Sequence, residues 1–368
     1  MIWNWGFACS HLCSQWHCCS NELCRSIFDD NHRAIQHSPK SRCYGHDVRL
    51  LGMNILDPTP LSFPEESSVE DTQNACRKYK VRPPTLNASL FRDLLKGTAL
   101  NPELQVSLVR GWKEGFTLGS HLPPTNHFVP ERLNRPLEQT EVLRKGLEKE
   151  KKLGRLHGPI TEPYYDGHWF KNHWISPYFA IPKKRLKGLP EKWRLIHHLS
   201  YHISGEQEAS FNGHIDINEY PTYFPTAMTG VHLVFCLSPQ GSVLAGRDVR
   251  DYYRNFLVNP HCWWQTYTYV LGGYWFNPYL PFGASSCTSI AQRQSDALRA
   301  AAKVYGVPGK SVAILDDFLL VCPRRDGETD ASVLDRGRRM CNKFDDFMSA
   351  MNLPKAPEKD QEANFSTE

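Results

Sequence analysis

The chain has 368 residues, 40% of them hydrophobic and 22% charged, so it can bury a substantial core and is not a wholly disordered protein. Its formal net charge of +4 is too small to indicate a nucleic-acid-binding protein by itself. No apolar run approaches the ~20 residues that span a bilayer, so no membrane partner is expected.

Residues 1–46 are rich in Cys and His. The first residues have neither a basic n-region nor an uninterrupted apolar stretch, so we expect an intracellular, reducing compartment without disulfides. Six of the twelve cysteines fall between Cys9 and Cys43, a crowding that indicates metal ligands in such a compartment. Thiolates and imidazoles suit Zn²⁺, and the candidate ligands are Cys9, Cys13, His17, Cys19, Cys24 and His32. Their spacing matches no regular zinc knuckle, so the alternative is a leader with no fold of its own.

Residues 47–85 are rich in Pro, Ser and acidic side chains, a composition typical of a linker. Residues 86–158 are predicted to form a helical leader. Helical periodicity extends from Leu90 to Phe116 and again from Pro136 to Leu153, where Gly154 ends the pattern.

From Ser176 onward, short strands and aromatic clusters replace the helical pattern. The segments SPYFAIPKK and KWRLIHHLS predict one hairpin, and QTYTYVL-GG-YWF predicts another with Gly272–Gly273 as its turn. GSVLAGRDV reads as a strand, and VAILDDFLLV as two strands with paired aspartates at the bend. Helices are predicted over about 289–305 and 332–351. This order of elements predicts an α+β domain with an antiparallel sheet.

Asp316 and Asp317 stand between two apolar runs, where adjacent carboxylates are unfavourable unless solvent or a cation takes their charge. For an isolated pair, a simple hairpin turn is the alternative, because Asp favours turns. Asp248, at the end of its own predicted strand, adds a third carboxylate that can converge on the same point. Nucleotidyl transfer uses two divalent ions about 4 Å apart, and oxygen-only ligands suit Mg²⁺.

Five segments resemble, in order, the motifs of reverse transcriptases, most closely those of tyrosine-recombinase (DIRS-like) retrotransposons. They are KWRLIHHLS, AGRDVRDYYRNFLVNP, LPFGASSCTSIAQR, ILDDFLLV and LPKAPEK. The resemblance covers about residues 85–360, and the ordered set is more specific than any single motif. It implies right-hand polymerase fingers and palm over 159–368, with an antiparallel palm sheet packed on helices. It also implies an RNA-directed DNA polymerase that takes an RNA/DNA template–primer and dNTPs.

The resemblance also implies a role for each matching residue. Two Mg²⁺ ions would be held by the family's metal ligands, here Asp248, the carbonyl of Val249, Asp316 and Asp317. Tyr253 would exclude a 2′-hydroxyl, the alternative being a packed core ring. The incoming nucleotide would be bound by Lys183, Arg194, Phe282 and Gly283, with glycine permitting a close approach. Lys359 would protonate the leaving pyrophosphate, the alternative being an ordinary surface lysine.

The sequence departs from the family pattern at three places. Ile314 stands where the family has a tyrosine. Tyr252 stands where the family has a small residue, and Asn352 stands where it has a glycine. The sequence also ends at Glu368, before a thumb or RNase H domain, so we expect the thumb to be missing or incomplete. These departures leave a catalytically dead, truncated nucleic-acid-binding remnant as one alternative. A zinc-finger interaction protein with an inert tail is another, and the oligomeric state is not predicted.

Overall fold

The computed structural model describes residues 16–18, 27–29, 60–129, 136–182, 193–202, 210–225, 234 and 240–365. Strands β1 (Trp16–Cys18) and β2 (Ile27–Asp29) pair antiparallel. The zinc prediction lies outside the described side chains, since these exclude Cys9, Cys13, His17, Cys19, Cys24 and His32. None of the described helices is long and apolar enough to cross a membrane.

A four-stranded antiparallel sheet forms one part of the molecule, with strand order β11-β12-β8-β13. The strands are β8 (Ser242–Asp248), β11 (Lys310–Ile314), β12 (Asp317–Pro323) and β13 (Gln361–Phe365). The predicted strand ending at Asp248 and the predicted double-aspartate hairpin are therefore neighbours in one sheet. The molecule is α+β with antiparallel sheets, as predicted.

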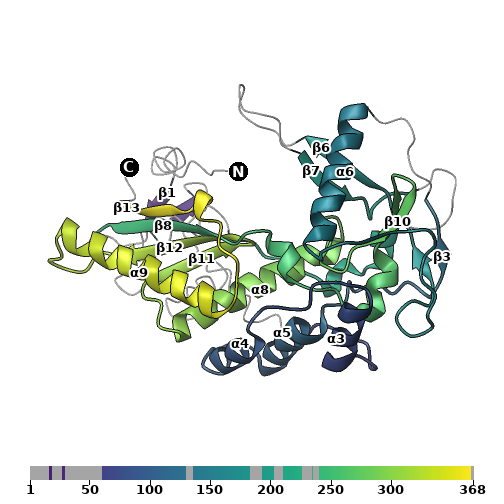
Figure 1. The fold of residues 1–368 in the computed structure, drawn as a ribbon. Coiled ribbons are helices and arrows are strands. Elements are labelled where there is room, and N and C mark those ends of the chain that lie inside the picture. Colours follow the sequence, from purple (N-terminus) through teal and green to yellow (C-terminus); the bar gives the residue numbers. More distant parts are fainter. Residues whose placement is uncertain are drawn as a thin grey trace.

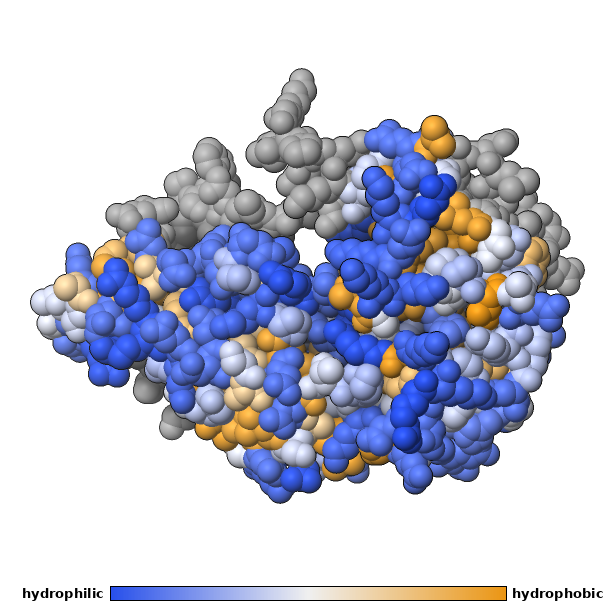
Figure 2. All heavy atoms as spheres, in the orientation of Figure 1, coloured by the Kyte–Doolittle hydropathy of each residue, from blue (hydrophilic) through white to orange (hydrophobic). Residues whose placement is uncertain are grey.

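Helix α9 (Asp330–Ala350) lies along one face of this sheet (Figure 1). Its buried side chains recur at helical spacing, as expected for a helix with one apolar face. Phe344 of α9 contacts Phe318 of β12, with ring centroids 5.3 Å apart. The opposite side of α9 is hydrophilic in Figure 2. The amphipathic pattern that predicted this helix thus reflects a real difference between its two sides.

Helices α3 (Val69–Lys78), α4 (Ala88–Leu95), α5 (Pro102–Glu114) and α8 (Ser285–Val304) pack together beside the sheet. The linker prediction over 47–85 is wrong at α3, which buries Ala75 and Cys76. Its Ser68 accepts a hydrogen bond from the Asp71 N–H at 3.0 Å. Ser and acidic residues are favoured at helix N-termini, so the composition that suggested a linker partly belongs to a helix cap.

The periodicity from Leu90 to Phe116 resolves into two helices rather than one. Asn101 caps α5 by accepting hydrogen bonds from the N–H groups of Glu103 and Leu104, and Pro102 opens the helix. Pro at the first helical position is well tolerated, whereas it would interrupt a continuous helix. The two helices then fold back on each other, and Phe91 stacks on Trp112 with ring centroids 4.0 Å apart.

A second part of the molecule surrounds α6 (Leu137–Lys152) and lies to the right in Figure 1. It contains the predicted hairpin of β6 (Tyr178–Pro182) and β7 (Trp193–His197), and a sheet of order β4-β10-β9. The sheet strands are β4 (His157–Ile160), β9 (Tyr267–Val270) and β10 (Gly273–Phe276). Short strands β3 (Asn126–His127) and β5 (His173–Trp174) pair parallel. The predicted helical leader therefore also contributes strands.

The turn between β9 and β10 is displaced by one residue from its prediction. Gly273 pairs with Val270, so the turn residues are Leu271 and Gly272, not Gly272 and Gly273. Their φ angles are 53° and 74°. A two-residue turn with positive φ at both positions matches the twist of a hairpin, although Leu is an unfavourable residue there.

Short 3₁₀ helices connect these elements. They are η1 (Phe211–His214), η2 (Ile217–Glu219), η4 (Tyr252–Asn255), η5 (Pro260–Thr266) and η6 (Pro357–Lys359). Two of them carry predicted site residues: η4 follows β8 and contains Tyr253, and η6 ends with Lys359.

Candidate active site

The three predicted carboxylates lie together at one end of the four-stranded sheet. Asp317, the first residue of β12, is the register partner of Asp248, the last residue of β8. Asp316 occupies the two-residue turn between β11 and β12, and its carbonyl accepts a hydrogen bond from the Val249 N–H at 3.0 Å. Residues about seventy positions apart in the sequence are thus brought into one cluster.

Helix α8 holds the turn that carries Asp316. The Gln292 side chain donates to the Ala313 carbonyl and accepts from the Leu315 N–H, both at 3.0 Å. The Ser295 hydroxyl donates to the Leu315 carbonyl at 2.7 Å. Leu315 has a φ of 55°, which is unfavourable for a branched aliphatic residue. Gln292 and Ser295 are not among the predicted site residues, although they are two polar residues three positions apart on a predicted helix.

Lys359 provides a cation at the cluster. Its Nζ donates to both carboxylate oxygens of Asp248, at 2.9 and 2.7 Å. The Asp248 carboxylate is almost fully buried, whereas the lysine side chain is 55% exposed. The Ala356 N–H donates to the Asp248 carbonyl at 3.1 Å, which fixes the start of η6 beside β8. The resemblance therefore identified a lysine that does lie at the carboxylates.

The cluster retains uncompensated negative charge. Burial and the neighbouring Asp248 raise the pKa of Asp316. Partial loss of solvent, then the charges of Asp316 and Asp248, raise the pKa of Asp317 to about 6. Burial alone would lower the pKa of Lys359. The hydrogen bonds and negative charge of Asp248 outweigh this effect, so the pKa of Lys359 is raised. Three carboxylates beside one ammonium therefore repel one another.

The fit of these residues to Mg²⁺ is good in donor chemistry and incomplete in arrangement. All the donors are oxygen atoms, which Mg²⁺ prefers. The raised pKa values of Asp316 and Asp317 reflect crowded negative charge that such an ion would neutralise. Within the described ranges, however, no group of three or more His, Cys, Asp or Glu side chains is placed to hold a metal ion. The Asp248 oxygens face the Lys359 ammonium instead.

Tyr253 and Phe282 form an aromatic surface near the carboxylates. Their ring centroids are 4.7 Å apart, and the Tyr253 hydroxyl donates to Thr288 of α8 at 3.5 Å. Tyr253 is 8% exposed and Phe282 is 36% exposed. Tyr253 is thus packed, and its remaining exposed edge adjoins a more open ring.

Tyr252, which stands where the resembled motif has a small residue, is buried in the core. Its side chain is 2% exposed, and its hydroxyl contacts the Ser295 hydroxyl at 2.6 Å. In a 3₁₀ helix, successive side chains point about a third of a turn apart. The Tyr252 and Tyr253 side chains therefore point in different directions. The departure from the family pattern at this position is accommodated by α8.

Gly283 is required by the protein's own backbone. Its φ is 133°, and an added Cβ would lie 2.1 Å from the His197 carbonyl oxygen of β7. The glycine is therefore needed for the close approach of β7, and its role toward a nucleotide stays a prediction. Arg194 is exposed on β7, in register with Ile181. Lys183 lies outside the described residues, so the triphosphate roles of both cations stay predictions.

Asn352, the residue that replaces a family glycine, has a φ of 57°. Asn adopts this left-handed region more readily than most residues, because its short polar side chain can bond locally. Its Nδ2 donates to the Thr85 carbonyl at 3.0 Å. Asn352 is therefore compatible with the left-handed conformation of the turn before η6.

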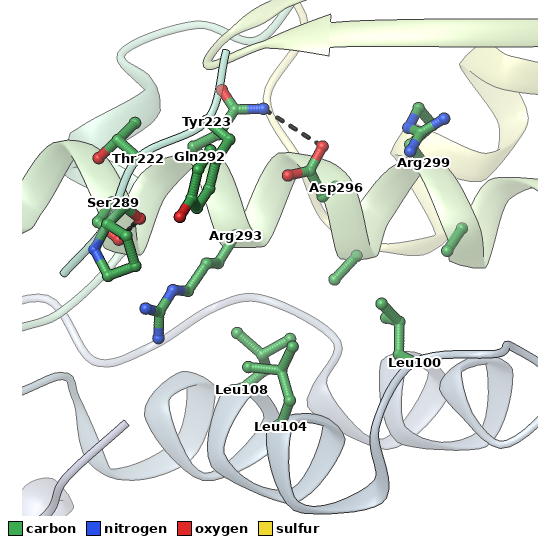
Figure 3. Close-up of a pocket in the computed structure, with 13 residues that line it drawn as sticks. Leu100, Leu104, Leu108, Thr222, Tyr223, Ser289, Gln292, Arg293, Asp296 and Arg299 are labelled. Atoms are coloured by element: carbon green, nitrogen blue, oxygen red, sulfur yellow. Dashed lines mark hydrogen bonds between the residues drawn. The ribbon is translucent and has the colours of Figure 1, made fainter. Parts of the chain in front are cut away.

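A pocket of about 50 Å³ lies against the side of α8, between Leu104 of α5 and Tyr223 (Figure 3). At ~15 Å³ for each water, it has room for a few water molecules. Figure 3 shows Gln292 hydrogen-bonded to Asp296 on its wall, at 3.3 Å. The predicted carboxylates do not line this pocket. Gln292 links it to the turn that carries Asp316.

No protein-family model and no curated protein matches the sequence. Among solved structures, the chain is similar to a foamy viral protease–reverse transcriptase in complex with double-stranded DNA. The TM-score is 0.45 and the sequence identity 13%, and the match covers 79% of this chain and 47% of that chain. The native protease–reverse transcriptase of prototype foamy virus gives a TM-score of 0.44, 12% identity, and coverage of 76% and 34%. The chain spans less than half the length of these structures. Similarity this distant carries no inference about chemistry, which has to come from the site.

Proposed function

We propose that this chain is the fingers and palm of a retrotransposon-derived reverse transcriptase, an RNA-directed DNA polymerase that adds dNTPs to a primer 3′-hydroxyl. The observation that carries the proposal is the convergence of Asp248, Asp316 and Asp317 at one end of the four-stranded sheet. Their proximity also raises the pKa of Asp316 and Asp317. Such a cluster at a sheet end suits transfer of a phosphoryl group, in which positioning and charge stabilisation dominate catalysis.

Asp248, Asp316, Asp317 and the Val249 carbonyl would hold the two Mg²⁺ ions. When bound, the ions would supply charge neutralisation and activation of the attacking hydroxyl. The ammonium of Lys359 holds a proton beside Asp248, where it could be given to the leaving pyrophosphate. The Tyr253–Phe282 surface would lie under the sugar and exclude a 2′-hydroxyl. Lys183 and Arg194 would hold the phosphates.

Primer extension on an RNA template with Mg²⁺ tests this proposal. The wild-type chain should incorporate dNTPs, and Asp316→Asn or Asp317→Asn should abolish incorporation while circular dichroism stays unchanged. Asp335→Asn is the matched control, because Asp335 is a surface carboxylate paired with Arg339 on α9. Normal extension by the Asp316 and Asp317 variants would contradict the metal-ligand roles.

A second candidate function is binding of nucleic acid without catalysis. Two observations favour it: Lys359 engages both oxygens of Asp248, and the described residues include no set arranged for a metal. This candidate predicts salt-sensitive binding of a template–primer duplex with no nucleotide incorporation. Binding and extension measured on the same preparation separate the two functions.

A further inference from the structure

The loop that follows Asp248 depends on a residue in an unfavourable backbone conformation. Asp251 has φ 50° and ψ 43°, the left-handed region, and it precedes η4, which carries Tyr253. For a residue other than glycine this conformation costs about 1 kcal/mol, so contacts around it must hold the loop in place.

The loop is held first by its own polar side chains. The Asn255 Nδ2 donates to the carbonyls of Arg250, Asp251 and Tyr252, at 3.1, 3.3 and 3.2 Å. The buried Tyr252 hydroxyl contacts Ser295, as described above. These bonds fix the start of η4 against α8 but leave the Asp251 side chain available.

The loop is also anchored by Arg155, which directly follows α6 and Gly154. The Arg155 Nη1 donates to the Asp251 carboxylate at 2.7 Å. Its Nε and Nη2 bond the two carboxylate oxygens of Glu150, at 3.1 and 2.8 Å. The Arg155 side chain is only 6% exposed, so its position is firmly set by the packing around it. A charge-assisted bond from a fixed guanidinium is a strong positional restraint.

Glu150 holds Arg155 at the end of α6 and also lies 3.7 Å from the guanidinium of Arg254 in η4. Glu150 and Arg155 are five residues apart in the same segment. Their bidentate pair therefore orients the Arg155 guanidinium independently of its contact with Asp251. The remaining Nη1 then reaches Asp251, 96 residues away in the sequence. The α6 segment thereby determines the position of a loop next to the carboxylates.

We propose that Arg155 is a positioning residue that, through Asp251, places the Tyr253 ring and so sets how strictly the site rejects a ribonucleotide. This inference rests on the proposed function and names a specificity determinant for it. Arg155 itself touches neither the carboxylates nor Tyr253. It acts through the backbone between Asp251 and Tyr253, where a small shift changes the clearance for a 2′-hydroxyl.

The first test compares Asp251→Asn and Asp251→Gly with the wild-type chain. Asn and Gly both tolerate positive φ, both leave Arg155 paired with Glu150, and both remove the anchoring charge. The measurement is kcat/KM for a dNTP and for the matching ribonucleotide in single-nucleotide extension. We expect the ratio to fall about three- to tenfold in both variants. Glu141→Gln is the control, since it removes a similar 2.7 Å pair with Arg144 from α6 without touching the loop.

If the role of Asp251 were purely structural, its variants would change kcat/KM for the dNTP and for the ribonucleotide by the same factor. An unchanged ratio of the two values would therefore overturn the inference. Glycine relieves the backbone strain, so loss of discrimination in Asp251→Gly assigns the effect to the lost anchor. Arg155→Lys should retain discrimination better than Arg155→Gln, because lysine keeps a cation near Asp251.

Hydrogen exchange of residues 249–256 tests the positioning without catalysis. Both Asp251 variants should exchange faster in this segment, with α8 unchanged, and equal exchange would overturn the anchoring role. If the wild-type chain extends no primer, the proposed function and the specificity role both fail. Exchange then still decides whether Arg155 holds the loop.

Discussion

Lys359 Nζ lies 2.7 and 2.9 Å from the two carboxylate oxygens of Asp248, so the cation nearest the cluster is supplied by the protein. An ion held by Asp248 would need the same oxygens. Lys359 and Mg²⁺ are therefore expected to compete for the Asp248 carboxylate. Replacing Lys359 tests two effects separately: its contribution to folding stability and its competition with the metal ion.

Lys359→Met should lower the free energy of unfolding without Mg²⁺ by about 1 kcal/mol, because the buried Asp248 loses its partner while the half-exposed lysine limits the effect. The same variant should need less Mg²⁺ for half-maximal thermal stabilisation. Thermal unfolding across a Mg²⁺ titration measures both. Lys96→Met, which breaks an exposed pair with Asp93, is the control. An unchanged Mg²⁺ midpoint would show that there is no competition.

Asp317→Asn should stabilise the metal-free protein. Partial desolvation and the charges of Asp316 and Asp248 raise the pKa of Asp317 to about 6, so its ionised form is unfavourable at neutral pH. An amide removes that charge, and because the side chain is partly exposed we expect a gain of only about 0.5–1 kcal/mol. Urea unfolding in EDTA is the measurement. A loss of stability would mean that the carboxylates do not repel one another.

The stability of the protein should also depend on pH through Asp296. Burial raises the pKa of this carboxyl to about 7, whereas an unfolded Asp titrates near pH ~3.9. Between these values the folded state binds the extra proton, so stability is full below pH ~4 and falls until about pH 7. Asp296→Asn should flatten this part of the profile in urea unfolding. An unchanged slope would exclude Asp296 as its source.

Gly283→Ala should be strongly destabilising, by about 2–4 kcal/mol, because the new Cβ would meet the His197 carbonyl and the φ of 133° is unfavourable. Gly167→Ala is the matched control: its φ is 72°, but nothing lies within 4 Å of the added atom. Its cost should be about 1 kcal/mol. Thermal unfolding of both variants separates backbone strain from collision. Equal losses would mean that β7 can move away.

Local patterns in the sequence were sufficient for much of the fold. The segment GSVLAGRDV and the apolar runs around Asp316 and Asp317 predicted strands that the structure has as β8, β11 and β12. The helical spacing in 332–351 predicted α9 nearly to its ends. These predictions succeed because each depends on residues within one element, whose side-chain period is set by the backbone alone.

Other features depended on surroundings that no local pattern encodes. The Ser and acidic residues before α3 fit a linker and a helix cap equally well until Ala75 and Cys76 are seen to be buried. The burial of Tyr252 required the position of Ser295 on α8. Hydrogen bonding between residues far apart in the chain is a property of packing, so propensity could not decide between these alternatives.

The sequence by itself determined the candidate carboxylates, the strands that carry them and the lysine that follows. Only the tertiary structure decided that Lys359 meets Asp248 across 111 residues and that Arg155 anchors Asp251 across 96. The physical reason is that strand and helix patterns arise from neighbouring residues, whereas the charge balance and geometry of a site arise from groups that meet only after the chain has folded.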